Sequence, residues 1–342
     1  MRKAAPLIVA ILVAACASPA PSPSQGVATS SPAPTASLPA ALAGLVELDA
    51  LVSAETVIEA GWPLQWATVM DGSLWLPNFE GAPPSVGRLD TDSLALQETV
   101  DLRSEVDQFP PDATGIYGSG EGVWVTLAGQ DAVGLIDPAT NKVVRRITIE
   151  GDAYGLAVDG RDLWITDFEN NVVLRVNAKT GKELARIDAS GPYEVAVGDD
   201  AVWVSEKDSG NLMRIDPDTN AVVDRIGIGG SPGVLVAAGS VWARGRDSKV
   251  IKRIDPATNE IVATIDLPSN VFDVEYAGGK IWGAVGPLRG DCSDSAYLVR
   301  IDPGTNALDG WIAAPCAFAM ATDGRHIWAT QDPGGILTVD AK

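Results

Sequence analysis

Histidine, cysteine and basic residues are scarce in this chain of 342 residues. It has one histidine and three cysteines, and its 25 lysines and arginines stand against 45 aspartates and glutamates. The resulting net charge of −20 repels nucleic acid and anionic lipid surfaces, so neither is an expected partner. No Ser/His/Asp order, phosphate loop or metal-ligand spacing occurs, so the sequence predicts no metal and no cofactor.

The N-terminal apolar stretch, residues 4–15, is too short to span a bilayer. It follows Arg2 and Lys3, which is the pattern of a signal peptide. Its end, Val13-Ala14-Ala15-Cys16, resembles a bacterial lipobox, which implies lipidation of Cys16. The alternative is an ordinary signal peptide with an incidental cysteine. We expect residues 1–16 to be a lipoprotein signal peptide and the protein to reside in the bacterial cell envelope, touching the membrane only through its lipid.

Residues 17–43 are dominated by Ala, Ser, Pro and Thr and carry no charge. Such a composition cannot bury enough apolar surface to fold, which predicts a disordered tether. We expect the remainder, residues 44–342, to be one domain and the protein to be a monomer.

A short phrase ending in tryptophan recurs along this domain with a period near 40 residues. The tryptophans are Trp75, Trp124, Trp164, Trp203, Trp242, Trp282 and Trp328, with gaps of 49, 40, 39, 39, 40 and 46 residues. Each repeat also carries a turn signal such as Asp216-Pro217-Asp218-Thr219-Asn220. Asp and Pro favour the opening of a turn, and Asn tolerates the left-handed conformation that closes a hairpin.

Alternating apolar and polar residues around these signals predict four strands per repeat. In the fourth repeat they are Val195–Val197, Val202–Ser205, Asn211–Asp216 and Ala221–Ile228. A repeat of this length with several short strands is typical of a β-propeller. We therefore predict an all-β, seven-bladed propeller of four-stranded antiparallel blades. The last repeat lacks its fourth strand, so we expect Val52–Ala60 to complete that blade and close the ring, with no strand left over.

The Asp-Pro-x-Thr-Asn turns, followed by valine-rich strands as in Asp137–Val144, resemble the YVTN (YncE-like) β-propeller family. This resemblance covers roughly residues 50–342 and implies the fold and an extracytoplasmic location. A more distant one, to virginiamycin B lyase, implies an enzyme that uses a histidine, a glutamate and Mg²⁺. The single histidine, His326, is expected in a turn on the face opposite the candidate site, so that catalytic motif is not matched.

One face of the propeller gathers the irregular features of the sequence. Extra residues fall at 79–84, 103–111 and 286–295, in loops that the strand order places on the same face. Cys292 and Cys316 also fall on this face, on neighbouring blades, which predicts a disulfide in an oxidising compartment. Variable loops on a rigid scaffold are where binding usually resides.

Residues nine and ten positions before each tryptophan should ring the central channel, and those two or three after it should surround that ring. The ligand-binding candidates are Tyr154, Asp167, Tyr193, Glu194, Glu206, Arg244, Phe272, Asp273 and Gln331, with Asn78, Thr114 and Phe318 at equivalent positions. Aromatic, acidic and amide groups with one arginine suit a polar organic ligand. The aromatic side chains could instead simply plug the channel.

Two functions remain open from the sequence. The first is a non-enzymatic, lipid-anchored binding or interaction module whose partner is a small polar molecule, a glycan or a protein. The second is an envelope lyase or hydrolase that uses acids on the loop-bearing face. A histidine or a metal-ligand cluster on that face would favour the enzyme, and the sequence shows neither.

Overall fold

Residues 36–342 form one compact unit. The computed structural model describes residues 38–57, 66–78, 85–103, 115–127, 130–229, 232–245, 249–288, 292, 295–332 and 334–342. The predicted signal peptide, Cys16 and most of the predicted tether lie outside the described residues. Among the described segments, no helix has the length and hydrophobicity needed to cross a membrane.

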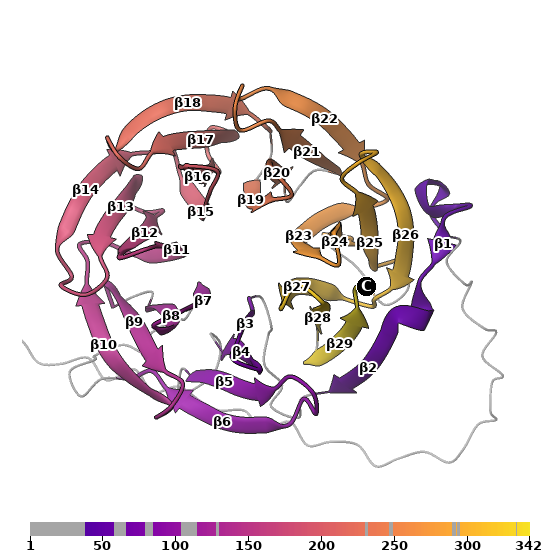
Figure 1. The fold of residues 1–342 in the computed structure, drawn as a ribbon, viewed down its shortest axis with the longest axis horizontal. Helices are drawn as coiled ribbons and strands as arrows, with labels where there is room; N and C mark the ends of the chain where they lie inside the picture. Colours follow the sequence, from indigo (N-terminus) through magenta and orange to yellow (C-terminus); the bar gives the residue numbers. More distant parts are fainter. Residues whose placement is uncertain are drawn as a thin grey trace, which may run out of the picture. The chain divides into compact units, whose positions relative to one another are not determined.

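Apart from two 3₁₀ turns, the regular structure of the described chain is β, and it forms seven sheets arranged in a ring (Figure 1). Blades one to three are β3 (Thr68–Met70), β4 (Ser73–Asn78), β5 (Ser85–Asp90) and β6 (Leu96–Asp101); β7 (Ile116–Ser119), β8 (Gly122–Leu127), β9 (Ala132–Asp137) and β10 (Lys142–Thr148); and β11 (Ala153–Asp159), β12 (Asp162–Asp167), β13 (Val172–Asn177) and β14 (Glu183–Asp188). Blades four and five are β15 (Pro192–Gly198), β16 (Ala201–Glu206), β17 (Asn211–Asp216) and β18 (Ala221–Gly227); and β19 (Pro232–Ala237), β20 (Ser240–Gly245), β21 (Val250–Ile254) and β22 (Ile261–Asp266). Blades six and seven are β23 (Asn270–Ala277), β24 (Lys280–Gly286), β25 (Tyr297–Asp302) and β26 (Ala307–Ala313); and β27 (Ala317–Thr322), β28 (His326–Gln331) and β29 (Gly335–Asp340) with β2 (Val52–Val57). The predicted seven-bladed propeller is confirmed.

The N-terminal strand completes the last blade, as predicted. β2 pairs antiparallel with β29, with Val57 opposite Gly335. One detail of the prediction is wrong, because a strand is left over: β1 (Val46–Glu47) adds to blade six, parallel to β26. Gly310 makes this docking possible, since a Cβ there would lie 2.5 Å from the Leu48 side chain.

The segment before β1 also packs on the propeller. Ala40–Leu42 form the 3₁₀ turn η1, and Asp49–Leu51 form η2. Leu42 is fully buried in the cluster that contains Trp242, and Leu45 packs against the same cluster. The tether predicted for residues 17–43 therefore extends a few residues too far. The composition of residues 17–43 does not reveal this packing, because it depends mainly on one buried leucine, Leu42.

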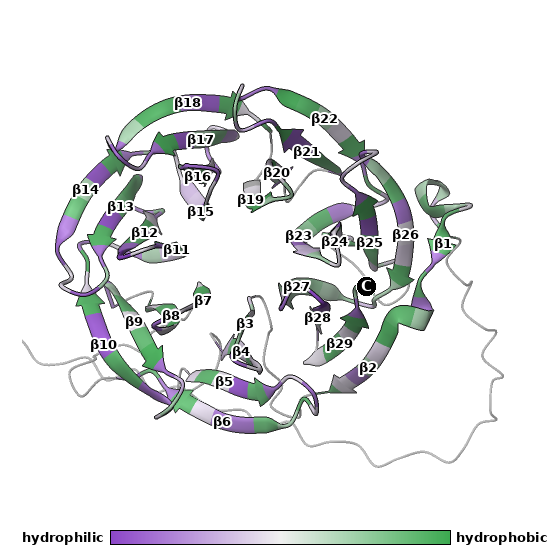
Figure 2. Cartoon of the chain, in the orientation of Figure 1, coloured by the Kyte–Doolittle hydropathy of each residue, from purple (hydrophilic) through white to green (hydrophobic). Residues whose placement is uncertain are grey.

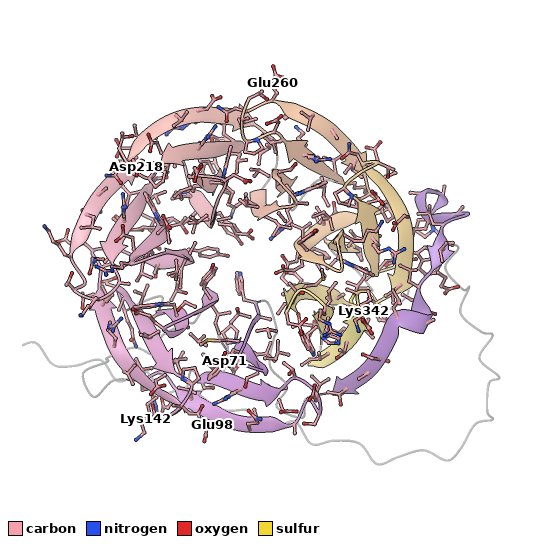
Figure 3. All side chains as sticks on the ribbon, in the orientation of Figure 1. Asp71, Glu98, Lys142, Asp218, Glu260 and Lys342 are labelled. Atoms are coloured by element: carbon pink, nitrogen blue, oxygen red, sulfur yellow. A yellow bond between two sulfur atoms is a disulfide. The ribbon has the colours of Figure 1, made fainter. Side chains whose placement is uncertain are left out.

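The repeated tryptophans lie on the second strand of each blade, and none is more than 2% exposed. Each buries roughly 150–250 Å² of surface, which contributes several kcal/mol. Trp203, for example, packs with Leu212 of its own blade and Val241 of the next. Outside this core, hydrophobic and hydrophilic residues alternate along the outermost strands (Figure 2), and Glu98, Lys142, Asp218 and Glu260 project from the outer rim (Figure 3).

An arginine stacks on the tryptophan and reaches the next blade. Arg214 lies opposite Trp203 in the register, with its Cζ 5.2 Å from the ring centroid. Its Nη1 donates to the Pro256 carbonyl and to Asn259 Oδ1, both at 2.7 Å, in the hairpin tip of blade five. Blades one, three and five repeat this arrangement, which we call the interblade clamp, with Arg88, Arg175 and Arg253. The tip asparagine thus closes its hairpin and also accepts a hydrogen bond from the preceding blade.

Three N-terminal truncations test how the ring closes. Removing residues 17–37 should leave the free energy of unfolding nearly unchanged. Extending the deletion through Leu45 removes buried leucine surface and should cost about 2 to 4 kcal/mol. Extending it through Val57 exposes the edge of β29 and should cost several kcal/mol more. Urea denaturation measures all three, and equal midpoints would contradict closure by β2.

A double-mutant cycle tests the clamp. Arg214→Ala and Asn259→Gly should each destabilise by about 1 to 2 kcal/mol, since each removes the same cross-blade hydrogen bond. Glycine is chosen because Asn259 has a φ of 61°. The loss of unfolding free energy in the double variant should be smaller than the sum of the two single losses, whereas the losses at independent sites would be additive. Glu260→Gln, on the exposed rim beside the clamp, is the matched control and should change little.

Candidate functional site

The strand register defines the face on which the candidate residues lie. In blade three, Ala153 at the start of β11 pairs with Asp167 at the end of β12, which pairs with Val172 at the start of β13. The starts of the innermost strands and the loops between second and third strands therefore share one face, which we call the loop face. The expected disulfide between Cys292 and Cys316 is present here, with Cα atoms 4.9 Å apart.

A cavity of about 220 Å³ lies among the innermost strands, and all seven blades contribute to its wall. Five of the candidate residues line it: Tyr193, Glu194, Arg244, Phe272 and Asp273. Phe318, at an equivalent position, lines it too. The residues expected to ring the channel therefore line it in part, and open space remains among the aromatic side chains of the wall.

A hydroxyl group two residues after the tryptophan holds the start of the inner strand in several blades. Thr126, Thr166, Ser205 and Thr330 each accept from a backbone N–H and donate to the carbonyl of the same inner-strand residue. Blades one and six have Pro77 and Ala284 at this position, and blade five has Arg244. Among the described residues, Arg244 does not replace the contact that the hydroxyl makes with the inner strand. Blade five therefore has a charged residue at a position that serves the backbone in four other blades.

Arg244 lies in the cavity wall between two acids from the blades on either side. Its Nη2 donates to Glu194 Oε1 at 2.5 Å and lies 3.8 Å from Asp273 Oδ1. Gly233 makes room for it, because a Cβ there would lie 2.5 Å from the guanidinium carbon. Arg244 is only 7% exposed, and its Nε has no hydrogen-bond partner among the described residues.

Three carboxyl groups share the cavity with this one arginine. Glu194 and Asp273 each accept a backbone N–H from the next blade, at 3.2 and 2.7 Å. Burial raises the pKa of Asp273 to about 6, although Arg244 opposes the shift. Burial and the neighbouring Asp273 carboxylate raise the pKa of Glu275 well above its usual range. The cavity therefore holds more acid than its arginine neutralises.

Aromatic rings surround these charges. The rings of Tyr154 and Tyr193 lie 4.3 Å apart between centroids, and their hydroxyl groups are hydrogen-bonded. The rings of Trp66 and Tyr154 make a T-shaped contact with centroids 5.9 Å apart, and Phe272 stacks on Phe318 at 5.0 Å. Flat apolar surfaces therefore stand on two sides of the acids and the arginine.

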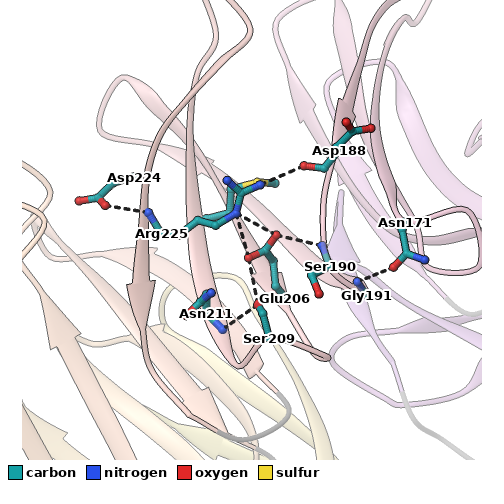
Figure 4. Close-up of polar contacts among 10 residues, drawn as sticks. Asn171, Asp188, Ser190, Gly191, Glu206, Ser209, Asn211, Asp224 and Arg225 are labelled. Carbon is teal, nitrogen blue, oxygen red and sulfur yellow. Dashed lines mark hydrogen bonds and ion pairs between the residues drawn. The ribbon is translucent and has the colours of Figure 1, made fainter.

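Four predicted candidates are not in the cavity wall: Tyr154, which packs against Tyr193, and Asp167, Glu206 and Gln331. Glu206 is fully buried and holds the loop face together (Figure 4). It accepts from the Ser190 N–H at 3.0 Å and the Ser209 hydroxyl at 3.1 Å, and Arg225 Nε lies 3.3 Å from both its oxygens. Asp167 Oδ1 accepts from the Asn170 N–H at 3.0 Å, and Gln331 Nε2 donates to the Pro315 carbonyl at 3.1 Å, so both also hold loop backbone. These polar residues, three positions after the tryptophan, therefore hold loop backbone, whereas Arg244, two positions after its tryptophan, lines the cavity.

The sequence reasoning missed one aromatic and one acidic residue of the cavity wall, Trp66 and Glu275. Trp66 lies nine residues before Trp75, the same spacing as Glu194 and Asp273 in their blades, so the repeat could have identified it. Glu275 has no such signal, because it lies further along β23.

Other predictions lie away from the cavity or beyond the described chain. Thr114, residues 79–84 and residues 104–111 lie outside the described residues. His326 starts β28 at the end of the blade opposite the loop face, with its Nδ1 3.0 Å from Asp323 Oδ2. Within the described segments, no group of three His, Cys, Asp or Glu side chains could hold a metal ion.

Comparisons with known proteins establish the fold alone. No protein-family model and no curated protein sequence matches the chain. The β-propeller domain of Cps50 (Swd1) from Myceliophteria thermophila has a TM-score of 0.67 and 13% identity, covering 85% of this chain and 99% of that one. A chain in the mitotic checkpoint complex has a TM-score of 0.72 and 13% identity, covering 93% and 98%. At this identity the similarity confirms a β-propeller and carries no role from those proteins to this one.

Proposed function

We propose that this protein is a non-enzymatic, lipid-anchored binding protein of the bacterial cell envelope, and that its ligand sits in the central cavity. The observation that carries the proposal is Arg244, which occupies the position of the strand-holding hydroxyl in four other blades. Arg244 and the two acids beside it, Glu194 and Asp273, all line the central cavity. Convergent polar groups in a partly apolar cavity are the usual form of a small-molecule site. The cavity volume of about 220 Å³ favours a small polar molecule, or the end of a glycan or peptide, over a folded protein surface.

The envelope location is supported by two features. The lipobox-like sequence before Cys16 provides the anchor. The Cys292–Cys316 disulfide fits an oxidising compartment.

A lyase or hydrolase at the same cavity is the alternative. Asp273 and Glu275 favour it, because carboxyl groups with raised pKa can act as general acids. A bound compound that is recovered unchanged after long incubation supports binding, and its conversion supports catalysis.

Binding is tested by a thermal-shift screen of amino acids, amines and sugars, followed by calorimetry with the best compound. Arg244→Ala and Tyr193→Ala should each weaken its binding by roughly ten- to thirtyfold, because they remove anchors from a desolvated site. Asp218→Ala, on an exposed tip of the outer rim, is the control and should leave affinity unchanged. Equal effects of all three substitutions would contradict a site in the cavity.

The anchor is tested separately. The protein expressed with its own leader should partition with membranes, and Cys16→Ser should release it to the soluble fraction, because the acyl chains attach only to the cysteine. Mass spectrometry of the membrane form should find a lipid-modified Cys16. A wild-type protein that is fully soluble after processing would contradict lipidation without bearing on the cavity.

A further inference from the structure

We infer that the ligand of the central cavity is a small organic cation, an ammonium group that carries a hydrogen-bond acceptor beside it. This inference rests on the proposed function and names the chemical class that the cavity would take.

The charge balance of the wall calls for a cation. Glu194, Asp273 and Glu275 line the cavity with a single basic residue, Arg244. Arg244 is the only basic side chain in the described chain that acts on Asp273 and Glu275, and its hydrogen bond goes to Glu194. One guanidinium therefore serves both Glu194 and Asp273, at 2.5 and 3.8 Å, and Glu275 has no ion pair among the described residues. Since the described Asp and Glu groups do not converge as metal ligands, an organic cation fits better than a metal ion.

The aromatic walls suit the same ligand. Trp66, Tyr193, Phe272 and Phe318 line the cavity around the acids. The faces of aromatic rings attract cations, and ammonium groups are often held by such rings together with carboxylates. An anionic ligand would meet the opposite environment, with three carboxyl groups against one arginine that already has a partner.

Arg244 independently indicates a missing group. It is more than nine-tenths buried in the cavity wall, and its Nε–H donor has no partner among the described residues. A buried donor without an acceptor is costly, so the site is incomplete until a ligand oxygen accepts from this guanidinium. An ammonium group with a neighbouring carbonyl or hydroxyl satisfies both the acids and the arginine.

Three compounds with one phenyl ring separate these contributions in calorimetry. Phenylalaninamide carries an ammonium group and a carbonyl, phenethylamine carries the ammonium alone, and 3-phenylpropionate carries a negative charge. We expect phenylalaninamide to bind best, phenethylamine more weakly, and 3-phenylpropionate not detectably. Tighter binding of 3-phenylpropionate overturns the cation while leaving a site in the cavity. Binding of none of the three overturns this inference, and the wider screen then decides the proposed function.

Two substitutions assign the effects to residues. Glu275→Gln should weaken both amines about tenfold, because it removes an acid at nearly constant shape. Arg244→Lys keeps the charge but lacks the Nε–H, so it should remove most of the preference for phenylalaninamide over phenethylamine. Glu260→Gln on the outer rim is the matched control, and melting curves confirm that each variant is folded. Equal affinity of wild type and Glu275→Gln for both amines overturns the inference.

Proton release gives a readout that is independent of affinity. Near pH 6 the Asp273 carboxyl is partly protonated; Arg244 and Glu194 are the charged groups that act on it, and its carboxylate in turn raises the pKa of Glu275. A cation entering the cavity lowers the pKa of the acids, so binding should release a fraction of a proton. Calorimetry in two buffers of different ionisation enthalpy measures this release. Proton uptake would overturn the inference.

Discussion

The contact on which this ring depends is the arginine that stacks on a buried tryptophan and bonds to the hairpin tip of the next blade. Main-chain ladders hold strands within a blade, whereas side chains must hold one blade to another. The clamp gives that packing a direction, since Arg214 fits only if the tip of blade five presents Pro256 and Asn259. The tips resemble one another because they serve as acceptors as well as turns.

The ring closure lacks this contact and is held differently. The arginine of blade six, Arg300, stacks on Trp282 but bonds to Asp309 in its own blade. Blade seven takes its outer strand from the N-terminus, so it has no hairpin tip to offer. The segment that supplies this strand also adds β1 to blade six and buries Leu42 beside it. The N-terminal segment therefore replaces the missing clamp with strand pairing and apolar burial.

The repeat explains both the successes and the failures of the sequence predictions. Tryptophan spacing and the Asp-Pro-x-Thr-Asn turns are local signals, so the blades and strands could be predicted. The position of Tyr193, Glu194 and Asp273 relative to their tryptophans placed them at the channel. Glu206 lies three residues after its tryptophan and Arg244 two, and the sequence prediction grouped these two positions, although the first serves a loop and the second faces the inner strand. Leu42 was missed because its burial depends on a surface formed by distant residues.

The buried charged groups of the cavity wall lower the stability of the ring. Raising the pKa of Asp273 from 3.8 to about 6 corresponds to a cost on the order of 3 kcal/mol for keeping it ionised at neutral pH. A hydroxyl at position 244, as in blades two, three, four and seven, would leave the inner strand held without bringing a buried charge into the wall. The repeated clamps and buried tryptophans stabilise the ring enough to tolerate this local cost. Glu194 and Asp273 also hold the inner strands of the next blades, whereas Arg244 makes no such contact within the described chain, and this difference is the reason for proposing a ligand that completes the site.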